Sequence, residues 1–238
     1  MNATHRPVAV WDGLVRITHW INAFAVLLLL PLGAVLFGRE WLGISKPHVE
    51  TLINIHASIG FLLAASLTIR IAYLLAGEGV ASWRDVVPHT KAQFALGIAT
   101  IRYYLSGCKG ECPLYFAHNP LAGLAYTGFF LFAATQVITG AAMYLLGDGL
   151  IPAAHAHAGH HAAANAWPPE WLMDFHALIA LLIGMFIVAH LSALALHDLV
   201  EKRGLASSMI SGNKFFTDTE IEQLQQTGTM ADEATAEK

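Results

Sequence analysis

Residues 174–198 read DFHALIALLIGMFIVAHLSALALHD, and this stretch decides the fold of the chain. Between its two terminal aspartates it carries no Asp, Glu, Lys or Arg, and it is long enough to cross the roughly 30 Å hydrocarbon core of a bilayer as one helix. His176 and His190 lie fourteen residues apart within it. Fourteen residues of α-helix turn through about 1400°, about 40° short of four turns, and rise about 21 Å. The helix therefore presents two imidazoles on one face at two depths.

Ionisable side chains are costly inside a bilayer, and those that occur there usually line an interior path or hold a cofactor. Two histidines stacked on one helix face therefore suggest two stacked metal centres. Haem is the natural candidate for both.

The composition points to a membrane protein. Hydrophobic residues make up 55% of the chain and charged residues 13%, whereas soluble domains carry about 25% charge. Four stretches are long and apolar enough to span a bilayer, at residues 17–38, 52–76, 121–147 and 174–197. We expect an all-α, integral membrane four-helix bundle that forms one domain over residues 1–216, followed by a polar cytoplasmic tail over 217–238. The first span is too long for a signal peptide and lacks a small-residue cleavage site.

The basic residues predict the orientation. Only Arg39 and Lys46 lie in the loops that follow the first and third spans. The segments on the other side hold ten basic residues, namely Arg6, Arg16, Arg84, Lys91, Arg102, Lys109, Lys202, Arg203, Lys214 and Lys238. The positive-inside rule then places both termini and the long middle loop in the cytoplasm.

This topology gives each membrane histidine a depth. His56 and His176 fall near the outer surface, and His19 and His190 fall near the inner one. A low-spin b-type haem needs one axial imidazole on each side of its plane, supplied by helices that face each other. The two depth-matched pairs predict two haem b groups. No CxxCH motif occurs, so covalent attachment of c-type haem is excluded.

A histidine at a membrane boundary is often only an interfacial residue, and this alternative applies to His19 and to His56 taken singly. The depth matching of the pairs favours iron ligation. Arg70 lies fourteen residues after His56 and is expected at the inner level. Two readings stay open for Arg70, a haem propionate partner or a side chain that snorkels to the interface. Gly33 is expected to let the outer haem approach the first helix, whereas Gly60, Gly140 and Gly184 fit ordinary small-residue helix contacts instead.

Other polar residues carry weaker signals. The outer loop AAHAHAGHHAAANAWPP contains four histidines that suit a transition metal or simply a polar loop. Cys108 and Cys112 fall in the predicted cytoplasmic loop, where thiols are kept reduced, so we expect no disulfide. His197 and Asp198 are candidate proton donors to a quinone or ordinary residues of a helix end.

The chain resembles the b-type cytochrome subunits of membrane-bound nickel-iron hydrogenases, which are related to bacterial cytochrome b561 and to the gamma subunit of formate dehydrogenase. The resemblance rests on VRITHWINA (15–23), AHNPLAGLAY (117–126), ITGAAMY (138–144), the four histidines and the His56 to Arg70 spacing. The tail segment SSMISGNKFF (207–216) is the most specific. The chain departs from the family in its His- and Ala-rich outer loop, its cysteine pair and its polar tail.

The resemblance implies a four-helix bundle that anchors the small (iron-sulfur) and large subunits of a hydrogenase on its periplasmic face, in the bacterial inner membrane. By this resemblance His56 and His176 ligate the haem nearer the hydrogenase, and His19 and His190 ligate the other. The protein would pass electrons from hydrogen oxidation to ubiquinone or menaquinone. By analogy with the formate dehydrogenase subunit, a tentative quinone region comprises Arg16, Asn22, Asn119, His197 and Asp198. Several copies of the complex are expected to assemble, and no nucleic acid is expected as a partner.

The chain has too few cysteines for a nickel-iron site, so it is expected to activate no hydrogen itself. Two alternatives stay open. One is a cytochrome b subunit of another respiratory oxidoreductase, such as formate dehydrogenase or thiosulfate reductase, which would lack the tail segment. The other is a metal transporter that uses its histidines without haem.

Overall fold

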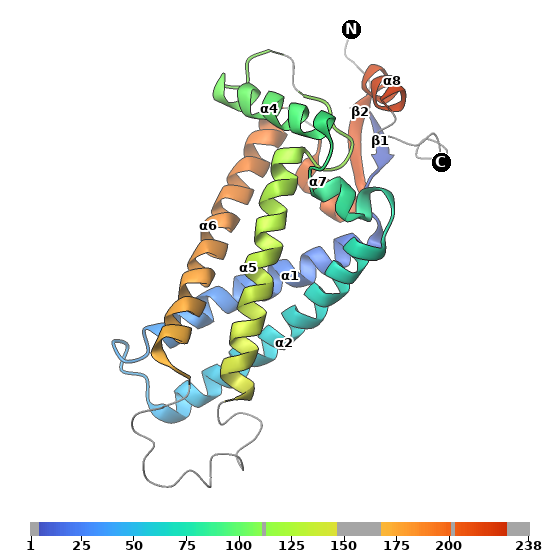
Figure 1. The fold of residues 1–238 in the computed structure, drawn as a ribbon. Coiled ribbons are helices and arrows are strands. Elements are labelled where there is room, and N and C mark those ends of the chain that lie inside the picture. The colour runs from blue at the N-terminus through green and yellow to red at the C-terminus, as the bar shows by residue number, and fades with distance from the viewer. Residues whose placement is uncertain (1–4, 111–112, 147–167, 201–202, 228–238) are drawn as a thin grey trace. The chain divides into compact units, whose positions relative to one another are not determined.

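The computed structural model describes residues 5–110, 113–146, 168–200 and 203–227. Four long helices dominate it (Figure 1): α1 (Gly13–Phe37), α2 (Lys46–Ala76), α5 (Pro120–Leu145) and α6 (Glu170–Val200). All four are long and apolar enough to cross a membrane. The prediction of a helical membrane protein with four spans is therefore confirmed, and the helices extend past most of the predicted limits by a few residues.

Local sequence explains where these helices begin. Asn119 accepts hydrogen bonds from the backbone N–H groups of Leu121 and Ala122, so it caps α5, whose first residue is Pro120. Proline suits the first helical position because the N–H that it lacks would have no partner there. Asp12 caps α1 in the same way, through the N–H of Val15 at 2.8 Å.

Shorter helices occupy the segment between α2 and α5, which we expected to be a loop. These are η1 (Gly79–Ala81), α3 (Trp83–Val86) and α4 (Lys91–Leu105). Thr90 and Gln93 form a reciprocal capping box at the start of α4, which supplies partners to backbone donors that a helix end otherwise leaves open.

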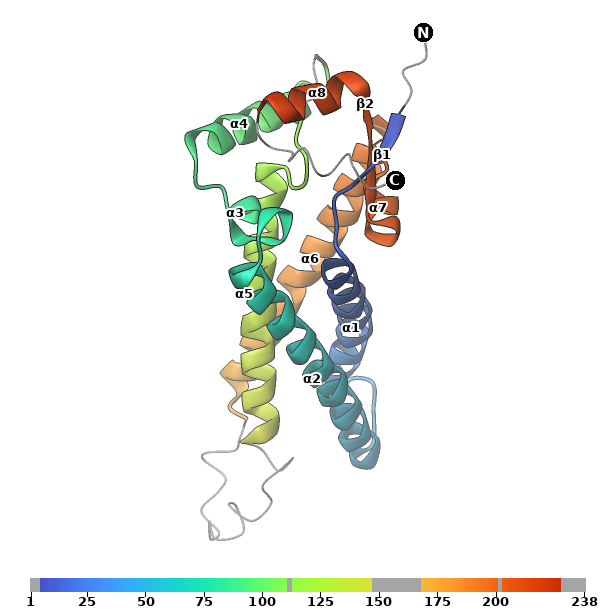
Figure 2. The ribbon, with the colours of Figure 1, turned by 90° about the vertical axis from the view of Figure 1, so that its right-hand side faces the viewer.

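A two-stranded antiparallel sheet joins the two ends of the chain (Figure 2). Strand β1 (His5–Ala9) pairs with β2 (Asn213–Thr217), and Val8 lies opposite Lys214. The helices α7 (Leu205–Ser211) and α8 (Asp218–Gln226) flank β2 in the sequence. The sequence did not predict this sheet. The segment that we expected to be a polar tail from residue 217 begins with α8, whose Ile221 and Leu224 are buried.

The chain divides into two compact units, and each long helix contributes a segment to both. Unit 1 comprises residues 1–19, 70–128 and 188–238, and unit 2 comprises 20–69 and 129–187. The core of unit 1 gathers Trp11, Val15 and Phe216 with Ile221 and Leu224 of α8, so α8 belongs to the folded part. The core of unit 2 is built by apolar residues of α1, α2 and α6, namely Ala25, Val26, Leu63, Ile179 and Ile183.

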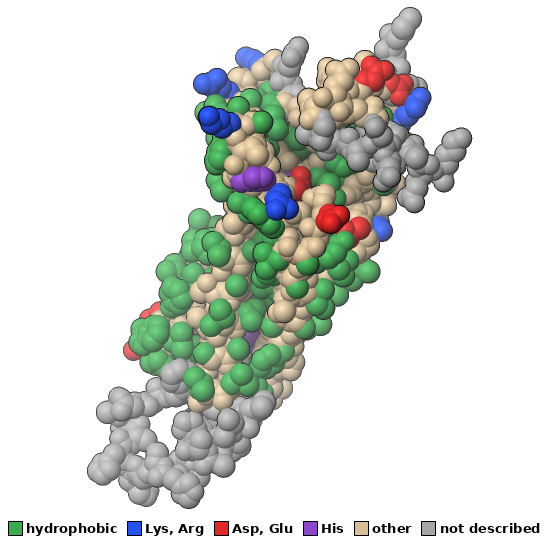
Figure 3. Space-filling model, turned by 45° about the vertical axis from the view of Figure 1, so that its right-hand side comes forward, with side chains coloured by type: hydrophobic (Ala, Val, Ile, Leu, Met, Phe, Trp, Pro, Cys, Tyr) green, Lys and Arg blue, Asp and Glu red, His purple; other side chains and the backbone are tan. Residues whose placement is uncertain are grey.

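The long helices keep most of their apolar surface outward. In the most apolar stretch of each helix, no more than 28% of the residues are buried within the chain, and hydrophobic side chains cover much of the surface in Figure 3. Water-soluble proteins rarely expose apolar surface on this scale. The pattern is that of helices whose solvent is lipid.

Candidate functional site

We call His56 and His176 the outer pair, and His19 and His190 the inner pair, after the topology predicted from the sequence. The outer pair lies within unit 2. His56 comes from α2 and His176 from α6, and their ring centroids lie 6.3 Å apart at an interplanar angle of 64°. A metal–imidazole bond is about 2.0–2.1 Å long and the ring centre lies about 1.1 Å behind the nitrogen, so two imidazoles on opposite sides of one metal have centroids about 6.3 Å apart. The separation in the structure therefore fits a bis-histidine metal centre.

A threonine orients His176. The hydroxyl of Thr139 donates to the carbonyl oxygen of Thr135 at 2.8 Å, and the same hydroxyl oxygen lies 2.8 Å from Nδ1 of His176. Because a hydroxyl has one proton, Thr139 accepts from His176, which places the imidazole proton on Nδ1. The Nε2 lone pair is then left for a metal, and an outer hydrogen bond of this kind is typical of ligating histidines.

Two glycines leave room for the outer rings. A Cβ atom on Gly140 would lie 3.1 Å from Cε1 of His176, and one on Gly33 would lie 3.4 Å from Cε1 of His56. The absence of a side chain at these positions allows α1 and α5 to approach the imidazoles closely. The Nδ1 atom of His56 is buried and has no hydrogen-bond partner among the described residues. A buried polar group without a partner is costly.

The inner pair lies within unit 1. His190 and Arg70 are close enough to His19 to interact with it electrostatically. The ring of Tyr126 meets His190 edge-on, with centroids 5.9 Å apart. The depth matching from the sequence therefore pairs the same residues that the structure brings together, His56 with His176 and His19 with His190.

Arg70 is buried, with 6% of its surface exposed, so within unit 1 it does not extend to solvent as a snorkelling side chain would. Asp12 lies within electrostatic range of Arg70, and the hydroxyl of Tyr73 donates to Oδ2 of Asp12 at 2.8 Å. The inner pair thus has a buried guanidinium beside it and a carboxylate nearby. Such a cation suits the propionate of a b-type haem.

The residues predicted to surround a quinone have different neighbours. Two of them cap backbone: Asn119 caps α5, and Asp198 accepts from the N–H groups of Leu205 and Ala206 at the start of α7. The Arg16 guanidinium donates to the carbonyl of Ile210 at 2.6 Å. Helix ends always offer polar groups, so sequence alone did not separate capping from ligand binding at these positions.

The remaining two quinone candidates are buried. His197 is 4% exposed and its Nε2 bonds to the hydroxyl of Tyr115. Asn22 belongs to unit 2, is 7% exposed, and its Oδ1 atom has no partner in the described part of the chain. These two side chains keep polar atoms that backbone capping does not use.

A buried lysine of unit 1 was not predicted from the sequence. Lys214 is 2% exposed, and its Nζ donates to the carbonyl oxygens of Phe116 and Ala117 at 3.0 and 2.6 Å. The ammonium also lies over the rings of Trp11 and Tyr115, at 5.4 and 5.2 Å. Lys214 belongs to the tail segment SSMISGNKFF, so that segment holds the loop in front of α5 in place. In the sequence, Lys214 follows Asn213 and precedes two phenylalanines, and this local pattern gave no sign of its burial.

A hydrogen-bonded pair, His118 and Asp85, was also not predicted from the sequence. His118 bonds through Nδ1 to Asp85, and its ring packs against Trp11 and Tyr126 with centroids 4.8 and 5.5 Å apart. Since Tyr126 also contacts His190, this pair is connected to the inner histidines through one ring. The signal in the sequence was the histidine in AHNP, which the prediction used only as part of a family motif.

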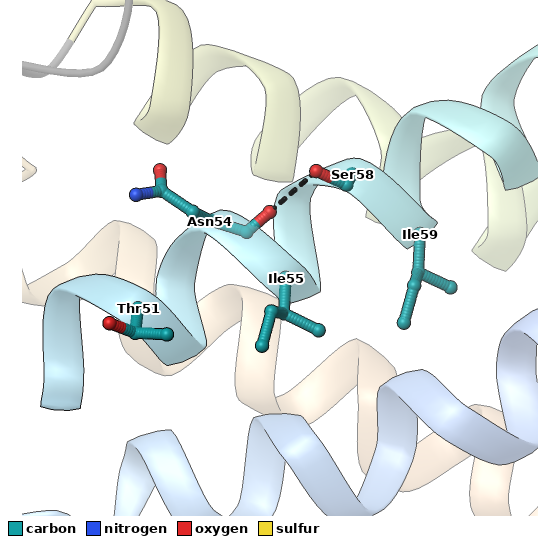
Figure 4. Close-up of a pocket in the computed structure, with 5 residues that line it drawn as sticks. All are labelled: Thr51, Asn54, Ile55, Ser58 and Ile59. Carbon is teal, nitrogen blue, oxygen red and sulfur yellow. Dashed lines mark hydrogen bonds between the residues drawn. The ribbon is translucent and has the colours of Figure 1, made fainter.

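Other sites offer less. Figure 4 shows a hollow lined by Thr51, Asn54, Ile55, Ser58 and Ile59 of α2, none of them titratable. Cys108 is a free thiol. No cluster of three or more His, Cys, Asp or Glu side chains that could hold a metal ion occurs among the described residues. The predicted loop sites at His155, His157, His160, His161 and Cys112 lie outside the described residues.

Known proteins resemble the chain over most of its length. The sequence pattern of prokaryotic cytochrome b561 matches residues 10–212. A probable Ni/Fe-hydrogenase B-type cytochrome subunit of Bradyrhizobium diazoefficiens is 31% identical over 91% of this chain and 90% of its own length. Similar proteins with corresponding names are 29% identical in Rhizobium leguminosarum bv. viciae, over 90% of this chain and 92% of the relative, and 26% identical in Escherichia coli K12, over 85% and 88%.

Proposed function

This chain belongs to the prokaryotic cytochrome b561 family, and from that premise we propose that it is the dihaem b-type cytochrome of a nickel-iron hydrogenase, passing electrons from hydrogen oxidation to membrane quinone. The relatives cited above are named as cytochrome subunits of Ni/Fe hydrogenases. Bound haem b supplies one-electron chemistry. The chain's own residues would hold the cofactor, set its environment and contact the hydrogenase and the quinone.

The observation that carries the proposal is the geometry of His56 and His176. Their centroid separation of 6.3 Å fits two imidazoles that would hold one haem. Thr139 presents the Nε2 of His176 in the neutral tautomer that a metal needs, and Gly33 and Gly140 leave the rings unobstructed. These residues of unit 2 would hold the outer haem.

His19 and His190 of unit 1 would hold the inner haem, with Arg70 as a cation for a propionate. An isolated guanidinium at this depth is costly, and anionic neighbours lower that cost. Asp12 is one such neighbour, in electrostatic range of Arg70. His176 and His190 belong to one helix, α6, and the fourteen residues between them rise about 21 Å. The edges of two haem groups held at these two levels would lie closer together than their irons, so this spacing suits electron transfer across a bilayer.

The proposed orientation of the protein in the membrane rests on the basic residues. Both termini and the α3–α4 segment would face the cytoplasm of a bacterium, because Lys and Arg concentrate in them. The hydrogenase small subunit, with its iron-sulfur clusters, and the large subunit would then dock at the periplasmic surface, beside His56 and His176. The protein would be a multi-pass component of the inner membrane and of a respiratory chain.

Ubiquinone or menaquinone would be reduced near the inner pair. His197 and Tyr115 form a buried hydrogen-bonded pair in unit 1, and a neighbouring quinone could take a proton from such a pair. Asn119 and Asp198 stay on the list of candidates, but their side chains already cap helices. Substitution of either one would therefore disturb the local backbone as well as a bound quinone.

The test uses the cytochrome purified together with the hydrogenase. We expect two haem b per chain and an alpha band in the reduced-minus-oxidised spectrum. His176→Ala and His190→Ala should each lower the ratio to about one, whereas His48→Ala, an exposed histidine of α2, should leave two. A spectrum without an alpha band would overturn the cytochrome assignment, and a wild-type ratio of one would overturn the dihaem proposal. Hydrogen-dependent reduction of a quinone analogue, absent in the two ligand variants, tests the electron path.

A further inference from the structure

Helix α4 exposes a stripe of large apolar side chains. Phe94, Ile98, Ile101 and Leu105 are 58%, 51%, 42% and 83% exposed. Their spacing of four, three and four residues places them within about 60° of one another around a helix. The stripe is therefore one continuous apolar face.

The opposite side of α4 packs on its own unit. Thr100 and Tyr103 are the buried residues of this helix, and they lie about 130–170° around the helix from the centre of the stripe. The stripe therefore faces away from unit 1. Nothing within the described residues of unit 1 covers it, since all four side chains are exposed.

A close contact shows that α4 lies beside the start of α5. A Cβ atom on Gly97 would lie 3.6 Å from Cβ of Pro120, the first residue of the membrane-spanning helix α5. The middle of α4 therefore lies beside the point at which α5 begins. Because α5 begins at Pro120 and is long and apolar enough to cross a membrane, that point would lie near the boundary between the hydrocarbon and the headgroups.

The charge around the stripe has one sign. Lys91 and Arg102 are exposed on α4, about 50–70° from the centre of the stripe. Arg84 and Lys109 are exposed on the segments before and after it. The single carboxylate among the described residues 83–110 is Asp85, which is paired with His118. Figure 3 shows basic side chains among hydrophobic ones in the region where Figure 1 places α4.

We propose that α4 is an interfacial helix that binds the anionic phospholipids of the leaflet next to unit 1. Its stripe of Phe94, Ile98, Ile101 and Leu105 lies among the acyl chains, and Lys91 and Arg102 contact anionic headgroups. An apolar face with flanking basic residues is the pattern of helices that lie in the membrane plane. The proposal goes beyond the proposed function and stands without it, because it needs neither haem nor hydrogenase.

Binding at this place has a consequence for the site. The segment from Leu105 to Pro120 connects α4 to α5 and contains Tyr115 and His118. A lipid-held α4 would therefore fix one end of the loop that contacts His197 and Tyr126. Anionic lipid is then a structural ligand of unit 1.

The test places single nitroxide labels along α4 in the full-length protein, with Cys108 and Cys112 replaced by serine. The protein is reconstituted in nanodiscs of phosphatidylcholine with or without phosphatidylglycerol. Labels at positions 94, 98, 101 and 105 should be accessible to oxygen and protected from a water-soluble nickel chelate. Labels at the exposed residues Ala92 and Ala99, about 130–150° around the helix from the centre of the stripe, should show the reverse.

A second measurement tests the contribution of the basic residues to lipid binding. Hydrogen exchange of the α4 amides should be slower with phosphatidylglycerol than without it, and Lys91→Gln and Arg102→Gln should each reduce that difference by about five-fold. Lys46→Gln, an exposed lysine at the start of α2, is the matched control. Full access of the stripe labels to the nickel chelate in both lipids would overturn the proposal. Protection that requires a second copy or the hydrogenase would assign the stripe to a protein interface instead.

Discussion

The Nδ1 atom of His176 lies 2.8 Å from the hydroxyl oxygen of Thr139, one turn after Thr135, whose carbonyl takes the hydroxyl proton. These two hydrogen bonds connect the backbone of α5 to the imidazole of His176 on α6. It makes the outer site an assembly of three helices, with His56 supplied by α2.

Thr139→Val should weaken the outer haem without removing either histidine. Loss of an outer hydrogen bond to a metal ligand typically lowers metal affinity or activity by about 10- to 100-fold. Haem loss during dilution, followed by the alpha band, measures the effect. Thr135→Val is the control, because its hydroxyl bonds within its own helix, to the carbonyl of Leu131. Equal haem retention in both variants would refute the role of Thr139.

Gly140→Ala should also disturb the outer site, by steric contact. The added methyl group would lie 3.1 Å from Cε1 of His176, so the ring or the helix must shift. We expect a lower haem content with the inner site retained. Gly184→Ala on α6 is the matched control, since a Cβ atom there meets nothing within 4 Å. An unchanged spectrum for Gly140→Ala would show that α5 can move aside freely.

Lys214→Met should destabilise unit 1. It keeps an apolar side chain of similar length but leaves the carbonyls of Phe116 and Ala117 without their donor. A buried acceptor without a partner costs about 1–3 kcal/mol, so we expect a loss on the order of 2–4 kcal/mol. Thermal unfolding in detergent measures it, and Lys109→Met, at an exposed lysine, should have little effect. A midpoint for Lys214→Met that equals the wild type would contradict this account.

Acid should loosen the C-terminal strand and α8 through Glu220. Burial raises the pKa of Glu220, but hydrogen bonds from the Thr217 N–H and the Arg203 guanidinium outweigh it, so the pKa is lowered from its ordinary value of 4.5. A group with a lowered pKa in the folded state stabilises that state above its unfolded pKa. The contribution is therefore complete above about pH 4.5 and is lost as the pH falls through the lowered value.

Hydrogen exchange of the β2 amides between pH 7 and 3 checks this expectation. Protection is taken relative to the intrinsic exchange rate at each pH, and Glu220→Gln should show at neutral pH the lower protection that the wild type reaches only in acid. Glu222→Gln removes the same charge from an exposed position of α8 and should behave like the wild type. Identical profiles for the two variants would exclude a special role for Glu220.

The four spans were predictable because each is a long apolar stretch, and the depth order of the histidines follows from their positions within those stretches. The sheet of β1 and β2 was not predictable. Each strand has five residues, β1 contains Pro7, and the pairing joins segments from opposite ends of the chain. Local patterns carry no information about such a distant partner.

The candidate site was also predictable only in part. Residue type and spacing indicated the four histidines and Arg70, because an ionisable group in an apolar helix is conspicuous. Thr139 was missed because a threonine in such a helix ordinarily bonds only to its own backbone. Asn119 and Asp198 were predicted for quinone although the structure shows them capping helices, since a polar residue at a helix end fits both roles equally well.

The pairing of His5–Ala9 with Asn213–Thr217 also sets an order of events during synthesis. β1 leaves the ribosome first, and about two hundred further residues are synthesised before its partner strand exists. Lys214 arrives with that strand, so the loop before α5 is fixed only after all four spans have been made. The strand that closes unit 1 is thus translated after all four spans, and a ribosome that stops before it releases a chain with its spans made and unit 1 still open.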